Sequence, residues 1–265
     1  MTVLTLTKHH GLGNDFLVAF EPALVDLAAL SQRLCDRRRG IGADGLLVGT
    51  DERPNAATMV IYNADGSRAE MSGNGVRCFA QALAARHGER GPFHISTDAG
   101  LRIVEIAATE DPGTVVASVD MGEVRSIEAP PGWASVGVLP DRPVAHLDVG
   151  NPHTVVAVDD VDAVDLVALG RRVPTVNLEV VEPGPEPNAI TMRVHERGAG
   201  VTDACGTGAV AAAWAAATWA LVRSEELLVH MDGGSAKVAL HIPMSGHATL
   251  TGPATYVARI EISVP

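Results

Sequence analysis

The sequence predicts an α/β (α+β) fold made of two pseudo-symmetric halves, each a curved, barrel-like sheet wrapped around one central helix. Two glycine-flanked turns, Ser72-Gly73-Asn74-Gly75 and Cys205-Gly206-Thr207-Gly208, lie 133 positions apart in a chain of 265 residues. Each turn precedes an alanine-rich apolar stretch that is typical of a buried helix. Short alternating segments typical of strands fill most of the remaining chain, so a duplicated architecture is expected.

The first half alternates apolar and polar residues around glycine-rich turns, and its first two strands flank the turn Gly11-Leu12-Gly13-Asn14. Residues 22–37, before the expected strand at 45–49, have helical spacing. The expected elements, in chain order, are strands at 3–8 and 15–19, a helix at 22–37, strands at 45–49 and 57–63, the helix that begins at Gly73, and three alternating segments within 93–125.

The second half repeats this order. Its first two strands flank the turn Gly150-Asn151-Pro152-His153, and a proline-rich loop at 183–187 separates two later strands. The expected elements are strands at 144–149 and 154–158, a helix near 161–171, strands at 175–182 and 189–195, the helix after Cys205, and closing strands near 226–231, 236–242 and 247–264. A cleft between the two halves would hold both glycine-opened helix N-termini.

Composition limits the classes of function. The chain is 46% hydrophobic with a formal net charge of -12, and its lysines and arginines are scattered, so no basic stripe for nucleic acid is expected. The longest weakly polar run, 209–222, is shorter than the roughly 20 residues that a membrane span needs. The N-terminal segment lacks the features of a signal peptide. We therefore expect a cytoplasmic protein with neither a nucleic acid nor a membrane as partner.

Three other motifs favour structural roles. The run Gly40-Ile41-Gly42-Ala43-Asp44-Gly45 matches the dinucleotide-binding pattern, but it follows a predicted helix and precedes a strand, the reverse of the required order. His9-His10 and the other histidines lack metal-ligand spacing, so no metal site is expected. Cys35 and Cys78 lie in apolar helical stretches and are expected to be inert core thiols rather than members of a disulfide framework.

The two paired turns carry the predicted chemistry. At each, a small nucleophilic side chain precedes a Gly-x-Gly that opens a helix, where N–H groups and the helix dipole attract an anion. A thiol at such a position, here Cys205, is expected to have a lowered pKa and to act as a base. Ser72 offers a hydroxyl instead. Either helix alone could be a core helix with a glycine-rich entry, but their paired placement favours function.

Six ordered blocks of the chain resemble the diaminopimelate epimerase family. They are Gly11-Leu12-Gly13-Asn14-Asp15-Phe16, Asn63-Ala64-Asp65-Gly66-Ser67, Ser72-Gly73-Asn74-Gly75-Val76-Arg77-Cys78-Phe79-Ala80, Gly150-Asn151-Pro152-His153, Val176-Asn177, and Glu196-Arg197-Gly198-Ala199-Gly200 leading to Ala204-Cys205-Gly206-Thr207-Gly208-Ala209. The resemblance implies cofactor-independent interconversion of LL- and meso-2,6-diaminopimelate, a step of lysine biosynthesis that also supplies a peptidoglycan precursor. It also implies that the C-terminal strand, about 252–265, returns to a first domain at 1–118, with the second domain at 119–251.

The resemblance also implies roles for single residues. The distal amino and carboxylate groups of diaminopimelate would be held by Asn14, Asn63, Asn151, Asn177 and Arg197. The reacting α-carboxylate would bind at Gly73-Asn74-Gly75 and Gly206-Thr207-Gly208. His153 and Glu196 would assist proton movement, with Glu196 also among the substrate contacts. An arginine fork and asparagine amides suit a carboxylate and an ammonium held in fixed chirality.

Ser72 departs from the family, which has a cysteine there, so that two thiols face opposite sides of the α-carbon. A hydroxyl holds its proton more tightly than a thiol, so turnover is expected to be impaired or modified. Ser72 could be an introduced substitution, a natural variant helped by a neighbouring base, or a mark of divergence. The alternative functions are a related amino acid racemase or isomerase acting on another substrate, and a non-catalytic diaminopimelate-binding protein. A homodimer is left open.

Overall fold

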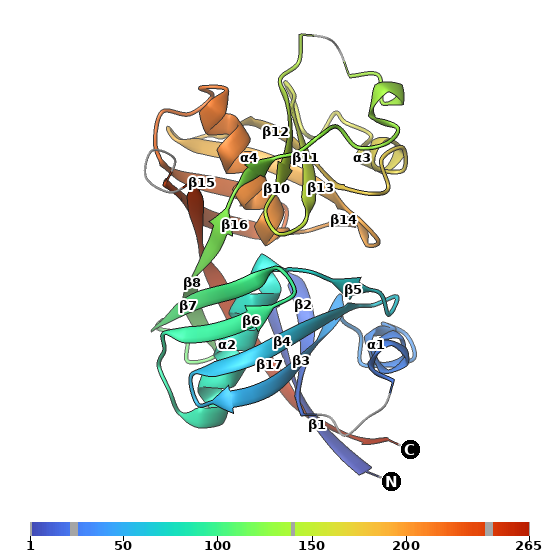
Figure 1. The fold of residues 1–265 in the computed structure, drawn as a ribbon, viewed down its shortest axis with the longest axis vertical. Helices are drawn as coiled ribbons and strands as arrows, with labels where there is room; N and C mark the ends of the chain where they lie inside the picture. Colours follow the sequence, from blue (N-terminus) through green and yellow to red (C-terminus); the bar gives the residue numbers. More distant parts are fainter. Residues whose placement is uncertain (1, 22–25, 139–140, 242–245, 265) are drawn as a thin grey trace. The chain divides into compact units, whose positions relative to one another are not determined.

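The chain forms two compact units in the computed structural model, which describes residues 2–21, 26–138, 141–241 and 246–264. Unit 1 comprises Met1–Val119 and Gly252–Pro265, and unit 2 comprises Asp120–Thr251. Two strands, β8 (Thr114–Glu123) and β17 (His247–Val264), contribute residues to both units (Figure 1).

Unit 1 is mainly strands, with two helices. Its elements are β1 (Thr2–Gly11), β2 (Asn14–Phe20), α1 (Leu27–Cys35), β3 (Gly45–Arg53), β4 (Ala56–Asn63), β5 (Arg68–Ala69), α2 (Gly73–His87), β6 (Phe93–Thr97), β7 (Gly100–Ala108), and parts of β8 and β17. Strand pairing closes on itself. β1 pairs with β2, β2 runs parallel to β3, β3 pairs with β4, β4 runs parallel to β6, and β6, β7, β8 and β17 follow until β17 returns to β1.

Unit 2 repeats this order of pairing. Its elements are β9 (Arg125–Ser126), the 3-10 helix η1 (Trp133–Ser135), β10 (Val144–Asp148), β11 (Pro152–Ala157), α3 (Leu166–Gly170), β12 (Asn177–Pro183), β13 (Ala189–Glu196), β14 (Gly200–Thr202), α4 (Gly206–Thr218), β15 (Glu226–Met231), β16 (Gly234–His241), and the rest of β8 and β17. β10 pairs with β11, β11 runs parallel to β12, and β13 runs parallel to β15, just as in unit 1. The duplicated α/β fold expected from the sequence is confirmed.

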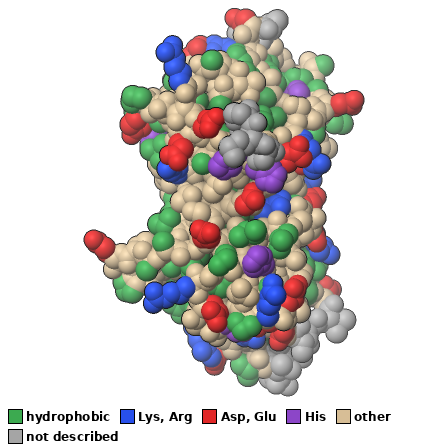
Figure 2. Space-filling view, turned by 60° about the vertical axis from the view of Figure 1, so that its left-hand side comes forward, with side chains coloured by type: hydrophobic (Ala, Val, Ile, Leu, Met, Phe, Trp, Pro, Cys, Tyr) green, Lys and Arg blue, Asp and Glu red, His purple; other side chains and the backbone are tan. Residues whose placement is uncertain are grey.

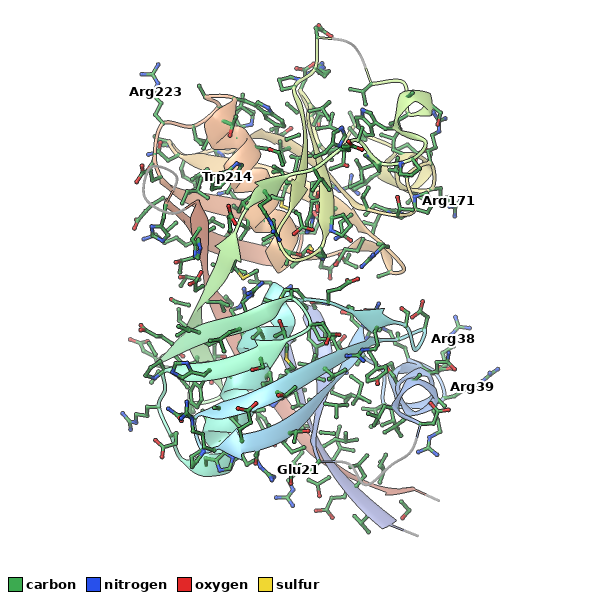
Figure 3. The ribbon with its side chains drawn as sticks, in the orientation of Figure 1. Glu21, Arg38, Arg39, Arg171, Trp214 and Arg223 are labelled. Carbon is green, nitrogen blue, oxygen red and sulfur yellow. The ribbon has the colours of Figure 1, made fainter. Side chains whose placement is uncertain are left out.

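In each unit one helix packs against more of the strands than the other does, α2 in unit 1 and α4 in unit 2 (Figure 1). Alanines dominate α4, and nearly all of its residues are buried because a methyl side chain lets strands approach from every side. The exceptions are Trp214, which is half-buried (Figure 3), and the last two residues, the half-buried Ala217 and the exposed Thr218. Helix α2 ends at Gly88, whose positive φ of 72° suits a residue without a Cβ.

The two outer helices are shorter than the sequence suggested. Helix α1 starts after the cap Asp26 and ends at Cys35, because the Asp36 carboxylate accepts from the N–H groups of residues 38 and 39 and turns the chain. The expected start at 22–25 lies outside the described residues. Helix α3 covers only Leu166–Gly170, because Asp160 binds the N–H groups of residues 162 and 163 in a turn before it. β5, β9 and β14, of two or three residues each, were not expected.

Charges of both signs are interspersed on the face shown in Figure 2. In unit 1, Arg38 and Arg39 are exposed beside α1, and in unit 2, Arg171 and Arg223 project at separate places (Figure 3). Within the described part of the chain, no helix has the length and apolar character needed to cross a membrane.

Candidate active site

The two glycine-opened helices begin with the same local geometry. Ser72 caps α2 in extended backbone and its Oγ accepts from the N–H of Gly75 at 3.0 Å. Cys205 caps α4 in the same way, with its Sγ 3.3 Å from the N of Gly208. A Cβ at Gly75 would lie 3.1 Å from Ser72 Oγ, and one at Gly208 would lie 3.2 Å from Cys205 Sγ. Glycine at this position therefore lets the cap side chain lie directly on the helix end.

In unit 1, the first half-site consists of Ser72, Asn74, Asn14 and Asn63. Asn74 is buried and donates from Nδ2 to Oδ1 of Asn14 at 3.1 Å. Asn14 in turn donates from Nδ2 to Oδ2 of Asp44 at 2.8 Å. Because each amide oxygen accepts and each amide nitrogen donates along this series, the orientations of both asparagines are fixed.

Arg77 lies one turn into α2 and is the first donor of the hydrogen-bond series that runs through Asn74 and Asn14 to Asp44. Its side chain is fully buried, and its Nη2 donates to Oδ1 of Asn74 at 2.7 Å. Nη1 has no hydrogen-bond partner among the described residues. Burial lowers the pKa of the Arg77 guanidinium to about 10. Gly11 and Gly252 leave room for it, since a Cβ at either would lie about 3.1 Å from an Arg77 atom.

Asn63 lies at the end of β4, in contact with the turn that follows. Its Nδ2 donates to Oγ of Ser67 at 3.0 Å, and Ser67 Oγ donates to Asp65 at 2.6 Å. Hydrogen bonds from Ser67 lower the pKa of the Asp65 carboxyl. The turn therefore holds the Asn63 amide with its nitrogen toward Ser67.

In unit 2, the second half-site has a buried polar centre formed by Asn151, His153 and Glu179. His153 and Glu179 are fully buried, and Nδ1 of His153 lies 2.6 Å from Oε1 of Glu179. The other ring nitrogen, Nε2, lies 2.8 Å from Oδ1 of Asn151. One imidazole therefore connects a residue predicted to bind substrate with a carboxylate that the sequence analysis did not select.

The Asn177 side chain binds the backbone of Arg197. The N–H of Arg197 donates to Oδ1 of Asn177 at 2.9 Å, and Nδ2 of Asn177 donates to the carbonyl of Pro152 at 3.3 Å. Asn177 thus joins the loop that carries Arg197 to the turn that carries Asn151. The Arg197 side chain is half-buried.

Cys205 has acidic neighbours, and this overturns the expected direction of its pKa. Burial raises the pKa of the Cys205 thiol well above its usual value, and the charges of Glu196 and Glu179 raise it further. The contacts with Thr207 and the N–H of Gly208 oppose that rise but do not cancel it. The thiol is therefore protonated at neutral pH in this state, because desolvation and two carboxylates outweigh the helix N-terminus.

Glu196 is the carboxyl group that binds this thiol. Burial raises the pKa of Glu196, while hydrogen bonds from Thr202 and Cys205 and the nearby His153 act in the opposite direction. Thr202, on β14, donates from Oγ1 to Oε1 of Glu196. Glu196 thus lies between the predicted acid/base thiol and a fixed hydroxyl donor.

The strand registers show which positions of the two half-sites correspond. In unit 1 Phe16 pairs with Gly45 across parallel strands, as His153 pairs with Asn177 in unit 2. Leu47 lies two residues after Gly45, as Glu179 lies two residues after Asn177. A Cβ at Gly75 would contact Leu47, and a Cβ at Gly208 would contact Glu179. Asn63 precedes Ser72 by nine residues, as Glu196 precedes Cys205. The counterparts of Glu179, His153 and Glu196 are thus Leu47, Phe16 and Asn63, which do not ionise.

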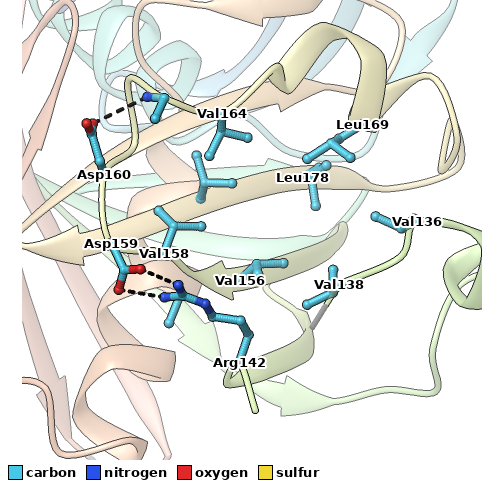
Figure 4. Close-up of a pocket in the computed structure, with 13 residues that line it drawn as sticks. Val136, Val138, Arg142, Val156, Val158, Asp159, Asp160, Val164, Leu169 and Leu178 are labelled. Atoms are coloured by element: carbon cyan, nitrogen blue, oxygen red, sulfur yellow. Dashed lines mark hydrogen bonds and ion pairs between the residues drawn. The ribbon is translucent and has the colours of Figure 1, made fainter. Parts of the chain in front are cut away.

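A separate cavity of about 300 Å³ lies in unit 2, lined mainly by valine and leucine (Figure 4). Val156 and Leu178 are among its walls, and the Arg142–Asp159 ion pair lies at one end. None of the predicted site residues lines it. No group of side chains in the described ranges is arranged to hold a metal ion.

Hydrogen bonds link four pairs of predicted residues, each pair within one unit: Asn74 with Asn14, His153 with Asn151, Arg197 with Asn177, and Glu196 with Cys205. Sequence reasoning missed two buried residues. Glu179 could have been found as the single acidic residue in the apolar strand segment Leu178-Glu179-Val180-Val181. Arg77 could have been found as a cation among small and apolar residues of a core helix. Whether Ser72 and Cys205 act on one ligand in a cleft stays a prediction.

Comparison with known proteins identifies the family. The family model for diaminopimelate epimerase matches residues 6–127 and 146–257. The diaminopimelate epimerase of Desulforapulum autotrophicum is 36% identical over 285 residues, which cover 98% of this chain and 99% of the relative. That of Mycobacterium avium is 38% identical over 291 residues, covering 98% and 97%.

Solved structures share the fold at lower identity. A predicted epimerase from Pseudomonas aeruginosa has a TM-score of 0.78 at 14% identity, covering 99% of this chain and 100% of that chain. A PhzF-family phenazine biosynthesis protein from Bacillus anthracis has a TM-score of 0.75 at 14% identity, covering 100% of both chains. The two sequence relatives and the family model, which extend over nearly the whole chain, show that it belongs to the diaminopimelate epimerase family.

Proposed function

We propose that this protein interconverts LL- and meso-2,6-diaminopimelate by proton transfer at the α-carbon, without a cofactor. The observation that carries the proposal is the matched pair of helix N-termini, each capped by a side chain able to hold a proton, Ser72 and Cys205. Membership of the family supplies the substrate. Inversion at the α-carbon by this route needs a base on one face and an acid on the opposite face, and these two caps are the candidates.

The proposed reaction breaks the α-carbon–hydrogen bond and leaves its electron pair on the α-carbon. The helix N-termini at Gly73-Asn74 and Gly206-Thr207 hold the α-carboxylate and stabilise the negative charge that develops there. One cap takes the proton from one face, and the other cap delivers a proton to the opposite face. In the reverse direction the two caps exchange roles.

Cys205 in its observed state is suited to deliver a proton, because its thiol is protonated and bonded to Glu196. To act as a base it passes this proton to Glu196, whose raised pKa favours accepting it. A substrate ammonium bound near the thiol would favour the charged thiolate that this transfer leaves on Cys205. Glu196 is thus proposed as the acid/base partner of Cys205.

The distal end of the substrate is proposed to bind Arg197 and the asparagines. His153 occupies Oδ1 of Asn151, so Asn151 offers its Nδ2 to a carboxylate. Ser67 occupies Nδ2 of Asn63, so Asn63 offers its oxygen to an ammonium. Asn177 supports Arg197 through the backbone. We expect this protein to work in the cytoplasm, and sedimentation would test whether two copies form a homodimer.

The deciding experiment incubates the purified protein with LL-diaminopimelate in heavy water and follows stereochemistry and deuterium at the α-carbon. An epimerase produces the meso isomer and incorporates deuterium, whereas a non-catalytic binding protein does neither. Lysine is the control substrate, because it lacks the distal carboxylate. Lysine turnover equal to that of diaminopimelate would instead support a racemase for another substrate.

A second arm of that experiment examines the distal end. Arg197→Ala removes the fork and is expected to weaken diaminopimelate binding by about 2 to 5 kcal/mol, as for a buried charged contact. Calorimetric titration of the variant with diaminopimelate measures this loss. Unchanged affinity would exclude Arg197 from the site.

A further inference from the structure

Glu179 is a fully buried carboxyl group in the middle of β12, with apolar neighbours on both sides in the chain. One of its oxygens lies 2.6 Å from Nδ1 of His153, and the other, Oε2, has no hydrogen-bond partner in the described part of the chain. A buried carboxylate with half of its acceptors unused is costly for folding. Its retention therefore needs an explanation beyond packing.

The hydrogen bonds of His153 determine how many protons its ring carries. Nδ1 faces a carboxylate oxygen of Glu179 and Nε2 faces the amide oxygen of Asn151. Both partners accept hydrogen bonds, so a ring that satisfies both must donate from both nitrogens. A ring that donates from both nitrogens is an imidazolium, for which the Glu179 carboxylate would be the counter-ion.

Unit 1 shows that this arrangement of strands forms without a histidine–glutamate pair. In unit 1 the equivalent positions hold Leu47 and Phe16, both buried, on strands with the same parallel pairing. Apolar side chains at these places therefore build the same arrangement of strands. Replacing a buried ion pair by apolar groups is often neutral or stabilising, so the pair in unit 2 is explained by function rather than by folding.

We propose that Glu179 is a positioning residue: it holds His153 as an imidazolium and, through Nε2, turns the Asn151 amide so that its nitrogen is directed to the substrate. This inference rests on the proposed function, in which Asn151 binds the distal end. If Glu179 lost its charge, the ring would keep one proton fewer and Nε2 or Nδ1 would become an acceptor. Asn151 would then be free to turn its oxygen outward, toward a carboxylate that it repels.

Two ionisable groups of unit 2, Glu196 and Cys205, lie near the Glu179–His153 pair. Glu196 and Cys205 face it from β13 and the start of α4, and the charges of His153 and Glu179 act on Glu196 in opposite senses. Gly208 is the point of closest approach, since a Cβ there would lie 2.7 Å from Oε1 of Glu179. The charges of the two members therefore oppose each other at Glu196, while the charge of Glu179 raises the pKa of the Cys205 thiol.

The first test is nitrogen NMR of the ligand-free protein at pH 7, with histidine labelled with nitrogen-15. His153→Gln identifies the His153 signals by their loss. We expect one-bond N–H couplings at both ring nitrogens of His153 in the wild type and at only one in Glu179→Gln. A neutral His153 ring with the same single proton in both proteins would overturn the proposal.

The second test measures kcat and KM for diaminopimelate. Glu179→Gln is expected to lower kcat/KM about 10- to 100-fold, the range for one charged hydrogen bond, with a rise in KM as part of the loss. Glu182→Gln is the matched control and is expected to be unchanged. Glu182 lies on the same strand, and among the described residues its side chain is bonded only to the N–H of Val161. Equal losses in both variants would contradict a specific role for Glu179.

Glu179→Leu copies the residue found in unit 1 and separates positioning from folding. We expect its unfolding midpoint in urea to equal or exceed that of the wild type while kcat/KM falls at least as far as in Glu179→Gln. A loss of stability and activity together, with His153 unchanged in the NMR experiment, would make Glu179 merely structural. If the wild type neither epimerises nor exchanges diaminopimelate, the proposed function fails, but the NMR result still decides the state of His153.

Discussion

Arg77 holds Asn74 by a 2.7 Å hydrogen bond from Nη2 to Oδ1, one turn inside the helix that Ser72 caps. No ion pair in the described ranges includes Arg77, so a lone buried cation fixes the amide at the helix end. The same bond orients Asn14, because Asn74 passes its own donor to Asn14. Two predicted binding residues thus depend on one guanidinium.

Arg77→Met should separate binding from stability. The variant loses the donor that orients Asn74, so diaminopimelate binding is expected to weaken by about 1 to 3 kcal/mol. Removing an uncompensated buried cation is expected to leave the free energy of unfolding unchanged or to increase it. Calorimetric titration and urea unfolding measure the two quantities. Tight binding by Arg77→Met would mean that Asn74 keeps its orientation without the arginine.

Glu196→Gln should alter the pH dependence of stability. Burial raises the pKa of Glu196, so the folded state keeps a proton that the unfolded state loses above about pH 4.5. Because the folded state then binds more protons, this group lowers stability as pH rises from that value through the raised pKa. The variant should be more stable than the wild type at pH 7, and the difference should vanish below pH 4. Urea unfolding at several pH values measures this difference in the free energy of unfolding. Glu225→Gln, at an exposed position, is the control. A difference that does not depend on pH would argue against the raised pKa of Glu196.

Cys205 should react slowly with iodoacetamide at neutral pH, in contrast to the fast reaction that its place at a helix start suggests. Its thiol is buried and its pKa is raised by burial, Glu196 and Glu179. Glu196→Gln removes one negative charge and an acceptor of the thiol proton, so it should speed alkylation and shift its midpoint to lower pH. Peptide mapping across pH follows the label, with Cys78, whose pKa burial raises to about 12, as the internal reference. Faster labelling of the wild type than of Glu196→Gln would refute the assignment of Glu196 as partner.

Ser72→Cys should increase epimerisation about 100-fold or more, the effect expected of a well-matched acid/base group. The reason is that a thiol gives up its proton far more readily than a hydroxyl. In heavy water the wild type should exchange the α-proton of one stereoisomer faster than it epimerises it, because Cys205 can act alone on its own face. Proton NMR and chiral chromatography measure the two rates. If neither Ser72→Cys nor Cys205→Ser changes the rate, the two-base mechanism is wrong.

The sequence was sufficient to predict the duplicated fold, because alternation in the strands and the two glycine-opened helices are local patterns. Helices α1 and α3 were predicted too long, because Asp36 and Asp160 bind backbone N–H groups and form turns that apolar periodicity does not reveal. Strand partners also lie far apart in the chain, so the correspondence of Leu47 with Glu179 became visible only through register.

The chemistry of the site was predicted less completely. The residues on its turns could be selected from motifs, since asparagines, glycines and the caps stand at recognisable places. The raised pKa of Cys205 could not, because it results from burial of the thiol in the folded unit and from Glu196 and Glu179, which are brought to it from two other strands. A helix start favours a thiolate, but desolvation and nearby carboxylates decide the outcome here.

The division of β17 between the units has a consequence for how the protein is made. Unit 2 is one continuous segment, Asp120–Thr251, so all of its residues leave the ribosome together. Unit 1 needs the residues of β17 that pair with β1, and these are synthesised after all of unit 2. During synthesis one edge of β1 therefore stays unpaired until β17 has been made. An N-terminal fragment that stops before Gly252 should expose this edge and aggregate.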